Sequence, residues 1–157
     1  MANIKGIVIY DTSYGNTKII AENIAETLKE SGLEVHLSHV KDIKELRAKD
    51  YDFLIFGSPT KIGNMSFTFR RFLGKIKGEE WRDKPFASFD TEMPDVIAKG
   101  GASAAEKIAE TLSEKGLKQV LPVLKAAVSG IKGPLEEGEV ENTKKYAKEL
   151  ASKLEGE

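Results

Sequence analysis

The 157-residue sequence contains no cysteine. This absence excludes disulfide bonds, thiolate metal sites, iron–sulfur clusters held by the chain, and cysteine nucleophiles. Any redox chemistry would therefore have to come from a bound cofactor. Histidine is nearly as scarce, with only His36 and His39 present. Because residues three apart on a strand point to opposite faces, we predict no metal site at this pair.

The chain also has no excess of charge of either sign, since 24 lysines and arginines stand against 25 aspartates and glutamates. No basic segment is interleaved with aromatic residues, as a nucleic-acid surface requires. No apolar run reaches membrane-spanning length, and the first residues lead into a strand-like segment without a signal-peptide pattern. We therefore expect a single cytoplasmic domain over residues 1–157 that neither binds nucleic acid nor inserts into a membrane.

Segments typical of strands and of helices alternate along the chain. Strands are predicted over residues 4–10, 33–40, 51–57, 85–89 and 118–124. Helices are predicted over residues 17–29, 67–76, 103–115 and 140–154, with an irregular excursion over 124–138. This alternation predicts an α/β fold with a parallel sheet covered on both faces. Ligands of such sheets bind at the carboxyl ends of the strands, so the loops after the first, third and fourth strands should converge.

The loop after the first strand has the composition of a phosphate cradle. It reads Thr12-Ser13-Tyr14-Gly15-Asn16-Thr17. Hydroxyl groups, a glycine and the N-terminal end of a helix together offer O–H donors, unpaired N–H donors and a positive dipole end. The loop contains no lysine or arginine, so one buried monophosphate suits it better than a triphosphate with magnesium. The alternative is an ordinary strand-to-helix turn in which Asn16 or Thr17 is the N-cap.

Two further loops are predicted at the same edge of the sheet. The loop after the third strand reads Ser58-Pro59-Thr60-Lys61-Ile62-Gly63-Asn64-Met65, and the loop after the fourth strand reads Asp90-Thr91-Glu92-Met93-Pro94-Asp95. Pro59 makes the exit from the third strand rigid, while Gly63 permits backbone angles that other residues resist. The acidic and hydroxyl groups after the fourth strand suit the polar edge of a flat ring.

These motifs resemble those of the flavodoxin family, and the resemblance covers nearly the whole chain. It rests on the first strand with Asp11 and the phosphate-type loop, and on Gly57-Ser58-Pro59-Thr60 followed by Gly63-Asn64-Met65. The resemblance implies a flavodoxin-like three-layer α/β/α sandwich with a five-stranded parallel sheet of order 2-1-3-4-5. It also implies one noncovalent FMN at the carboxyl ends of strands one, three and four.

Carried over to this sequence, the resemblance assigns three groups of cofactor-binding residues. Thr12, Ser13, Tyr14, Gly15, Asn16 and Thr17 would hold the phosphate. Ser58, Pro59, Thr60, Lys61, Ile62 and Gly63 would lie along the ribityl chain and one side of the ring. Asp90, Thr91 and Glu92 would approach the other side or the pyrimidine edge. A peptide at Ile62-Gly63 would turn to accept a hydrogen bond from the flavin N5.

Two functions remain open on this basis. The first is an electron carrier between a reductase and an acceptor protein, with no substrate of its own and hence no catalytic residue. The second is an NAD(P)H-dependent quinone or flavin reductase of the same fold. We favour the carrier, because the compact chain shows no insertion that would build a nicotinamide and quinone site.

Overall fold

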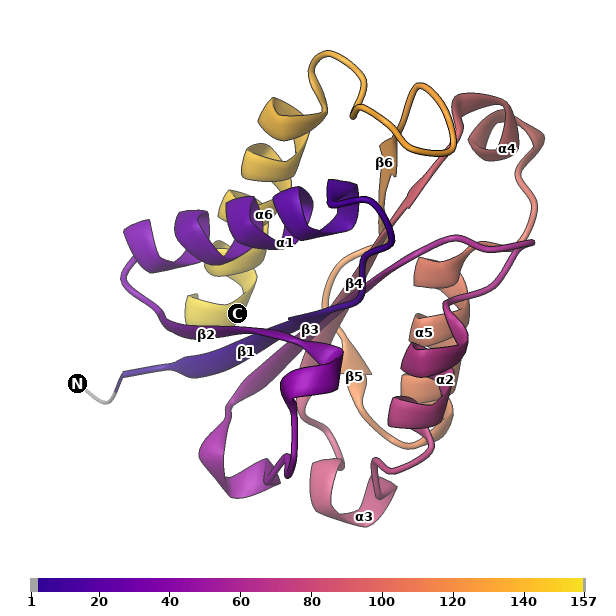
Figure 1. The fold of residues 1–157 in the computed structure, drawn as a ribbon. Helices are drawn as coiled ribbons and strands as arrows, with labels where there is room; N and C mark the ends of the chain where they lie inside the picture. The colour runs from indigo at the N-terminus through magenta and orange to yellow at the C-terminus, as the bar shows by residue number, and fades with distance from the viewer. Residues whose placement is uncertain (1–2, 157) are drawn as a thin grey trace.

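The computed structural model describes residues 3–156 and shows a parallel sheet between two layers of helices (Figure 1). The strands lie in the order β2-β1-β3-β4-β5, and β6 also pairs with β4. Every pairing between these strands is parallel. The strands are β1 Lys5–Tyr10, β2 Glu34–His39, β3 Phe53–Pro59, β4 Pro85–Glu92, β5 Lys118–Gln119 and β6 Leu124–Ala127. The predicted α/β architecture and the sheet order 2-1-3-4-5 are confirmed.

The helices cover both faces of this sheet. They are α1 Asn16–Glu30, α2 Phe67–Leu73, α3 Gly78–Trp81, α4 Pro94–Lys99, α5 Ala104–Glu114 and α6 Glu139–Gly156, with 3₁₀ turns η1 Val40–Asp42 and η2 Ala48–Asp50. Figure 1 shows α1 and α6 against one face and α2 and α5 against the other. Within residues 3–156, no helix is both long enough and apolar enough to cross a membrane.

The central strands are apolar on both faces because each face is covered. Alternate residues of β1 enter different cores. Val8 packs with Ile24 of α1 in one core, while Ile9 packs with Phe69 of α2 and Trp81 of α3 in the other. All five side chains are at most 1% exposed. Burying an apolar side chain of this size contributes about 1.5–3 kcal/mol, so the two cores hold the strand ends in place.

The fifth strand differs from the prediction, because it is divided into two short pieces. β5 pairs with Pro85 and Phe86, and β6 pairs with the far end of β4. Pro122 lies between the pieces, and proline has no N–H to donate to a ladder. The predicted irregular excursion over 124–138 therefore begins as a strand that borders the carboxyl end of β4.

The fourth strand is longer than predicted, and this changes the site. The prediction ended it at Phe89, but β4 continues through Glu92 and α4 begins at Pro94. The polar residues 90–92 read as a loop in the sequence, yet all three pair with β6, and Asp90 and Thr91 also pair with β3. Asp90 pairs in register with Ser58 of β3 and with Lys125 of β6. The expectation of a loop over residues 90–95 is therefore wrong for its first three residues.

Candidate functional site

The loop after β1 ends in a helix start whose N–H groups have no side-chain cap. The N-cap of α1 is Gly15, at φ 95° and ψ -9°, and it has no side chain with which to cap the helix. The alternative in which Asn16 or Thr17 is the N-cap is therefore wrong. A positive φ favours glycine, and no atom lies within 4 Å of where a Gly15 Cβ would stand. The first N–H groups of α1 have no acceptor within the helix, so this helix start can accept an anion.

Side chains of the same loop tie it to its neighbours. The Thr12 hydroxyl oxygen accepts a hydrogen bond from the Gly15 N–H at 2.9 Å. The Asn16 amide donates to the Lys132 carbonyl at 3.1 Å, and the Thr17 and Thr91 hydroxyls are 2.8 Å apart in a buried contact. The loop is thus anchored to β4 and to the turn after β6. Ser13 and Tyr14 remain exposed.

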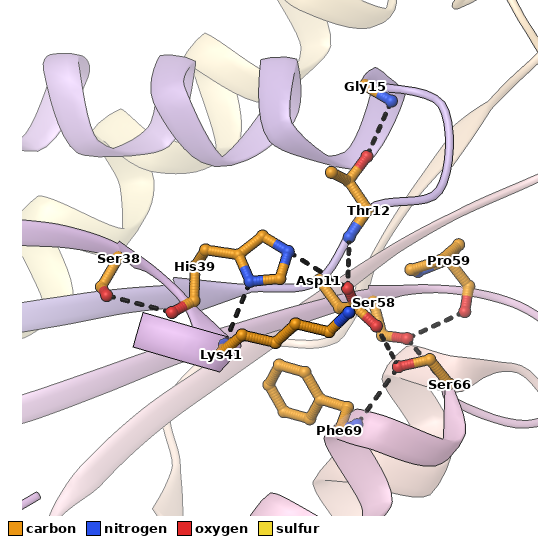
Figure 2. A network of polar contacts seen from close by, with 10 residues as sticks. All are labelled: Asp11, Thr12, Gly15, Ser38, His39, Lys41, Ser58, Pro59, Ser66 and Phe69. Atoms are coloured by element: carbon orange, nitrogen blue, oxygen red, sulfur yellow. Dashed lines mark hydrogen bonds and ion pairs between the residues drawn. The ribbon is translucent and has the colours of Figure 1, made fainter. Parts of the chain in front are cut away.

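Asp11 joins this loop to the loop after β3, as Figure 2 shows. Asp11 Oδ1 accepts from the Thr12 N–H at 2.8 Å, and Asp11 Oδ2 accepts from the Ser66 hydroxyl at 2.6 Å. Ser66 caps α2 by accepting from the Phe69 N–H, and its own N–H donates to the Ser58 hydroxyl oxygen at 2.9 Å. One carboxylate therefore sets the position of the loops after β1 and β3 relative to each other.

His39 completes this network from the end of β2. Its Nδ1 accepts from the Lys41 N–H at 3.0 Å, and its Nε2 lies 3.3 Å from Asp11 Oδ1 (Figure 2). Because Nδ1 accepts, the hydrogen of the neutral ring is on Nε2 and points to the carboxylate. The sequence prediction gave no role to Asp11, His39 or Ser66. The position of Asp11 directly after a buried strand was the one available signal.

The loop after β3 folds as a two-residue hairpin. Lys61 and Asn64 exchange both backbone hydrogen bonds, at 2.7 and 3.1 Å. The central residues have positive φ values, 49° for Ile62 and 72° for Gly63, as in a type I′ turn. A β-branched residue in this region is strained, and the Ile62 side chain is fully exposed, so packing within the chain does not explain its presence.

The fourth-strand residues are buried in the sheet. Asp90 is 0% exposed; its Oδ2 accepts from the Ala105 N–H at 2.9 Å, and its Oδ1 has no partner in the described chain. Burial raises the pKa of Asp90 to about 6. Burial, and next the charge of Asp90, raise the pKa of Glu92 to about 7. Lys125 is 3.9 Å from Glu92 Oε1.

These elements enclose a cleft of about 520 Å³ at the carboxyl ends of β1, β3 and β4. All the predicted site residues line it except Gly15, Ser58 and Asp90. Gly15 is the residue before α1, Ser58 belongs to the end of β3, and Asp90 precedes Glu92 by two residues on β4. Four lining residues were missed by the sequence prediction: Met93, Val96, Val128 and Ile131. They follow β4 and β6, whose ends were misplaced in the prediction.

The cleft has the size and the partly apolar lining of a small-molecule site. Its volume lies in the range of ordinary cofactor sites, roughly 300–1,000 Å³. The start of α1 borders one end. The remaining lining combines polar residues such as Lys61 and Glu92 with the apolar side chains of Pro59, Ile62, Met93, Val96, Val128 and Ile131. Among the lining residues, Tyr14 is the aromatic one. A ring system bound here would therefore contact mainly aliphatic groups.

Comparisons with known proteins agree with this geometry. The flavodoxin domain model matches residues 7–130. A flavodoxin of Aquifex aeolicus is 41% identical over 78 residues, which are 49% of this chain and 42% of that protein. A protoporphyrinogen IX dehydrogenase [quinone] of Escherichia coli K12 is 29% identical over 72 residues, 46% of this chain and 40% of that protein. The matches thus span about two fifths of these relatives.

A solved flavodoxin structure from the domain Archaea superimposes with a TM-score of 0.80 at 23% identity, and the match covers 96% of this chain and 99% of that one. At this identity the superposition establishes the fold. The sequence match over residues 7–130 adds the family, and the sheet order and the strand-end cleft agree with it. This chain belongs to the flavodoxin family.

Proposed function

We propose that this chain binds FMN in the cleft and carries electrons singly between a reductase and an acceptor protein in the cytoplasm. Family membership implies a flavin cofactor and redox partner proteins. The observation that carries the proposal is the uncapped N-terminus of α1 opening into a cleft with aliphatic walls. An anion site beside a flat apolar cavity matches a flavin that ends in one phosphate.

The residues of the first loop would hold the phosphate without a cation from the loop itself. Backbone N–H groups at the start of α1 and the hydroxyls of Thr12 and Ser13 are the available donors. The Thr12 oxygen already accepts from Gly15, so its hydrogen remains free to donate. A site of this kind suits one phosphate. A second phosphate, as in FAD, would find no lysine or arginine within this loop.

The hairpin after β3 supplies the contact on the open side of the cleft. A strained, fully exposed isoleucine at its tip is a local violation of turn chemistry, and such violations are expected at functional positions. We infer that Ile62 shields the flavin from water. The bound flavin would supply the capacity to take up electrons, and the Ile62-Gly63 peptide would accept a hydrogen bond from its N5.

FMN affinity tests the phosphate assignment. The full chain is titrated with FMN, riboflavin and FAD, and binding is followed by quenching of flavin fluorescence. The phosphate should strengthen binding of FMN over riboflavin by about a hundredfold, the worth of one or two hydrogen bonds to a charged group. Equal affinity for FMN and riboflavin would overturn the phosphate assignment, and failure to bind FMN would overturn the proposed function.

Stepwise anaerobic reduction then separates the carrier from the reductase. A carrier should accumulate the one-electron-reduced flavin, seen by its long-wavelength absorbance, and should need a separate reductase. Rapid oxidation of NADPH with a quinone by the purified chain alone would instead establish the alternative function. Gly63→Val should lower the yield of the one-electron-reduced state, whereas Gly138→Val, at another positive φ, should leave it unchanged. An unchanged yield in Gly63→Val would remove the role given to the hairpin.

A further inference from the structure

The carboxyl end of β4 places two buried acids on one face of the sheet. Asp90 and Glu92 are two residues apart on a strand, so their side chains point the same way, roughly 7 Å apart along the strand. Asp90 is 0% exposed and Glu92 5%. Each has one carboxylate oxygen, Asp90 Oδ1 and Glu92 Oε2, without a hydrogen-bond partner in the described chain. A buried carboxylate oxygen without a donor favours the protonated form of its group, because the charged form is poorly solvated there.

The charges around this pair do not balance two ionised acids. Among residues 3–156, the ammonium near them is that of Lys125 of β6, whose Nζ lies 3.9 Å from Glu92 Oε1 and only 3.1 Å from Glu106 Oε1 on α5. Lys125 therefore pairs more closely with Glu106 than with Glu92. Neutral donors are few: the Ala105 N–H bonds to Asp90, and the hydroxyls of Thr60 and Ser103 lie nearby. Three carboxyl groups thus share one cation.

Glu92 also lines the cleft, whereas Asp90 lies behind it. We propose that Asp90 and Glu92 hold one shared proton, and that Glu92 takes up or releases this proton when the charge of the molecule in the cleft changes. The identity of that molecule rests on the proposed function. The raised pKa values of both groups agree with a proton that stays bound near neutral pH. The pair titrates as a unit, because each charge disfavours the other.

The coupling follows from electrostatics at short range. When an external donor adds one electron to a flavin in the cleft, the new negative charge disfavours an ionised Glu92. A hydronium ion of the solvent then gives one proton to the Glu92 carboxylate: an O–H bond of the hydronium ion breaks, and a new O–H bond forms on Glu92. The added charge is neutralised inside the chain. The pair would thus let the reduction potential depend on pH through a protein group.

The first test needs no cofactor. Side-chain carboxyl carbons of the full chain are followed by ¹³C NMR as a function of pH. In the unmodified protein both Asp90 and Glu92 should titrate well above the ordinary range of acids. Asp90→Asn removes the like charge and should lower the pKa of Glu92 by about one unit, a tenfold change in proton dissociation. Glu110 is an exposed acid of α5, one turn beyond Glu106. Glu110→Gln is therefore the matched control, and it should change the pKa of neither Asp90 nor Glu92.

A second variant, Glu106→Gln, tests the proposal if the first variant does not fold. Glu106→Gln leaves both buried acids in place and frees Lys125 to pair with Glu92. The pKa of Glu92 should therefore fall, because the Glu106 charge that raises it is gone. Glu92 and Asp90 titrating in the ordinary range of acids in the unmodified chain would overturn the shared proton.

The second test uses the FMN-loaded protein. The reduction potential of the unmodified chain should become more negative as pH rises through the titration of the pair, and Glu92→Gln should flatten this dependence. Equal pH dependence in the two proteins would overturn the coupling while leaving FMN binding intact. Failure to bind FMN would instead remove the proposed function, and the coupling with it, but the titration in the cofactor-free chain would still decide whether the proton is shared.

Discussion

Asp11→Asn should loosen two cofactor loops at once. The carboxylate accepts from the Thr12 N–H and the Ser66 hydroxyl, and its side chain is only 13% exposed. Asparagine keeps one oxygen, which can still accept from Thr12. Its amide would face the Ser66 oxygen, which already accepts from the Phe69 N–H. One hydrogen bond to a charged group is lost, so the free energy of unfolding should fall by about 2 kcal/mol.

The matched control is Asp52, which lies near the other end of β1. Asp52 accepts from the Lys5 N–H at 2.9 Å in an exposed position. Asp52→Asn keeps that bond and should change the free energy of unfolding by less than about 0.5 kcal/mol. Urea unfolding measures both variants, and FMN titration should show a dissociation constant about tenfold weaker for Asp11→Asn alone.

A double-mutant cycle shows whether the effect passes through Ser66. Ser66→Ala removes the hydroxyl between Asp11 and the start of α2, so the two substitutions should be non-additive by about 1 kcal/mol. Additive effects of Asp11→Asn and Ser66→Ala would refute the view that Asp11 joins the loops through Ser66. An FMN affinity that falls equally in Asp52→Asn would refute its specific link to the site.

Three further outcomes follow from the structure. Ile62→Asn should raise the free energy of unfolding by about 1 kcal/mol, because Asn-Gly suits the turn. The same substitution should weaken FMN binding. Lower stability of the variant in urea would contradict the strain at Ile62. Gly57→Ala should cost at least 1–3 kcal/mol on thermal unfolding, since its Cβ would stand 2.1 Å from the buried Phe89 ring. The pKa of Glu92 is raised from 4.5 to about 7, so the contribution of this group to stability is present below pH 4.5 and is lost as the pH rises through 7. Glu92→Gln should remove roughly 3 kcal/mol of this pH dependence in urea titrations at pH 5 and 8, and an unchanged slope would contradict the raised pKa.

The sequence predicted the sheet because its signals are local. The buried runs of β1 and β3, the helical spacing in α1 and the glycine before α1 can each be recognised from a few neighbouring residues. The same holds for the phosphate-type loop, whose hydroxyls and glycine are contiguous. These parts of the chain were placed within a few residues of their observed bounds.

What the sequence missed depends on partners that are distant in the chain. Residues 90–92 are polar and read as a loop, but they form a strand because β3 and β6 both offer them ladder partners. The missed cleft residues Val128 and Ile131 follow β6, whose existence depends on that same pairing.

By itself the sequence determined an α/β sheet, a candidate phosphate loop and the strand ends at which a cofactor would bind. Only the tertiary structure brought Asp11, His39 and Ser66 into one network and buried Asp90 beside Glu92 with a single lysine for three acids. The physical reason is that a hydrogen bond or a shift in pKa depends on distance and burial. Residues tens of positions apart acquire these only when the sheet assembles.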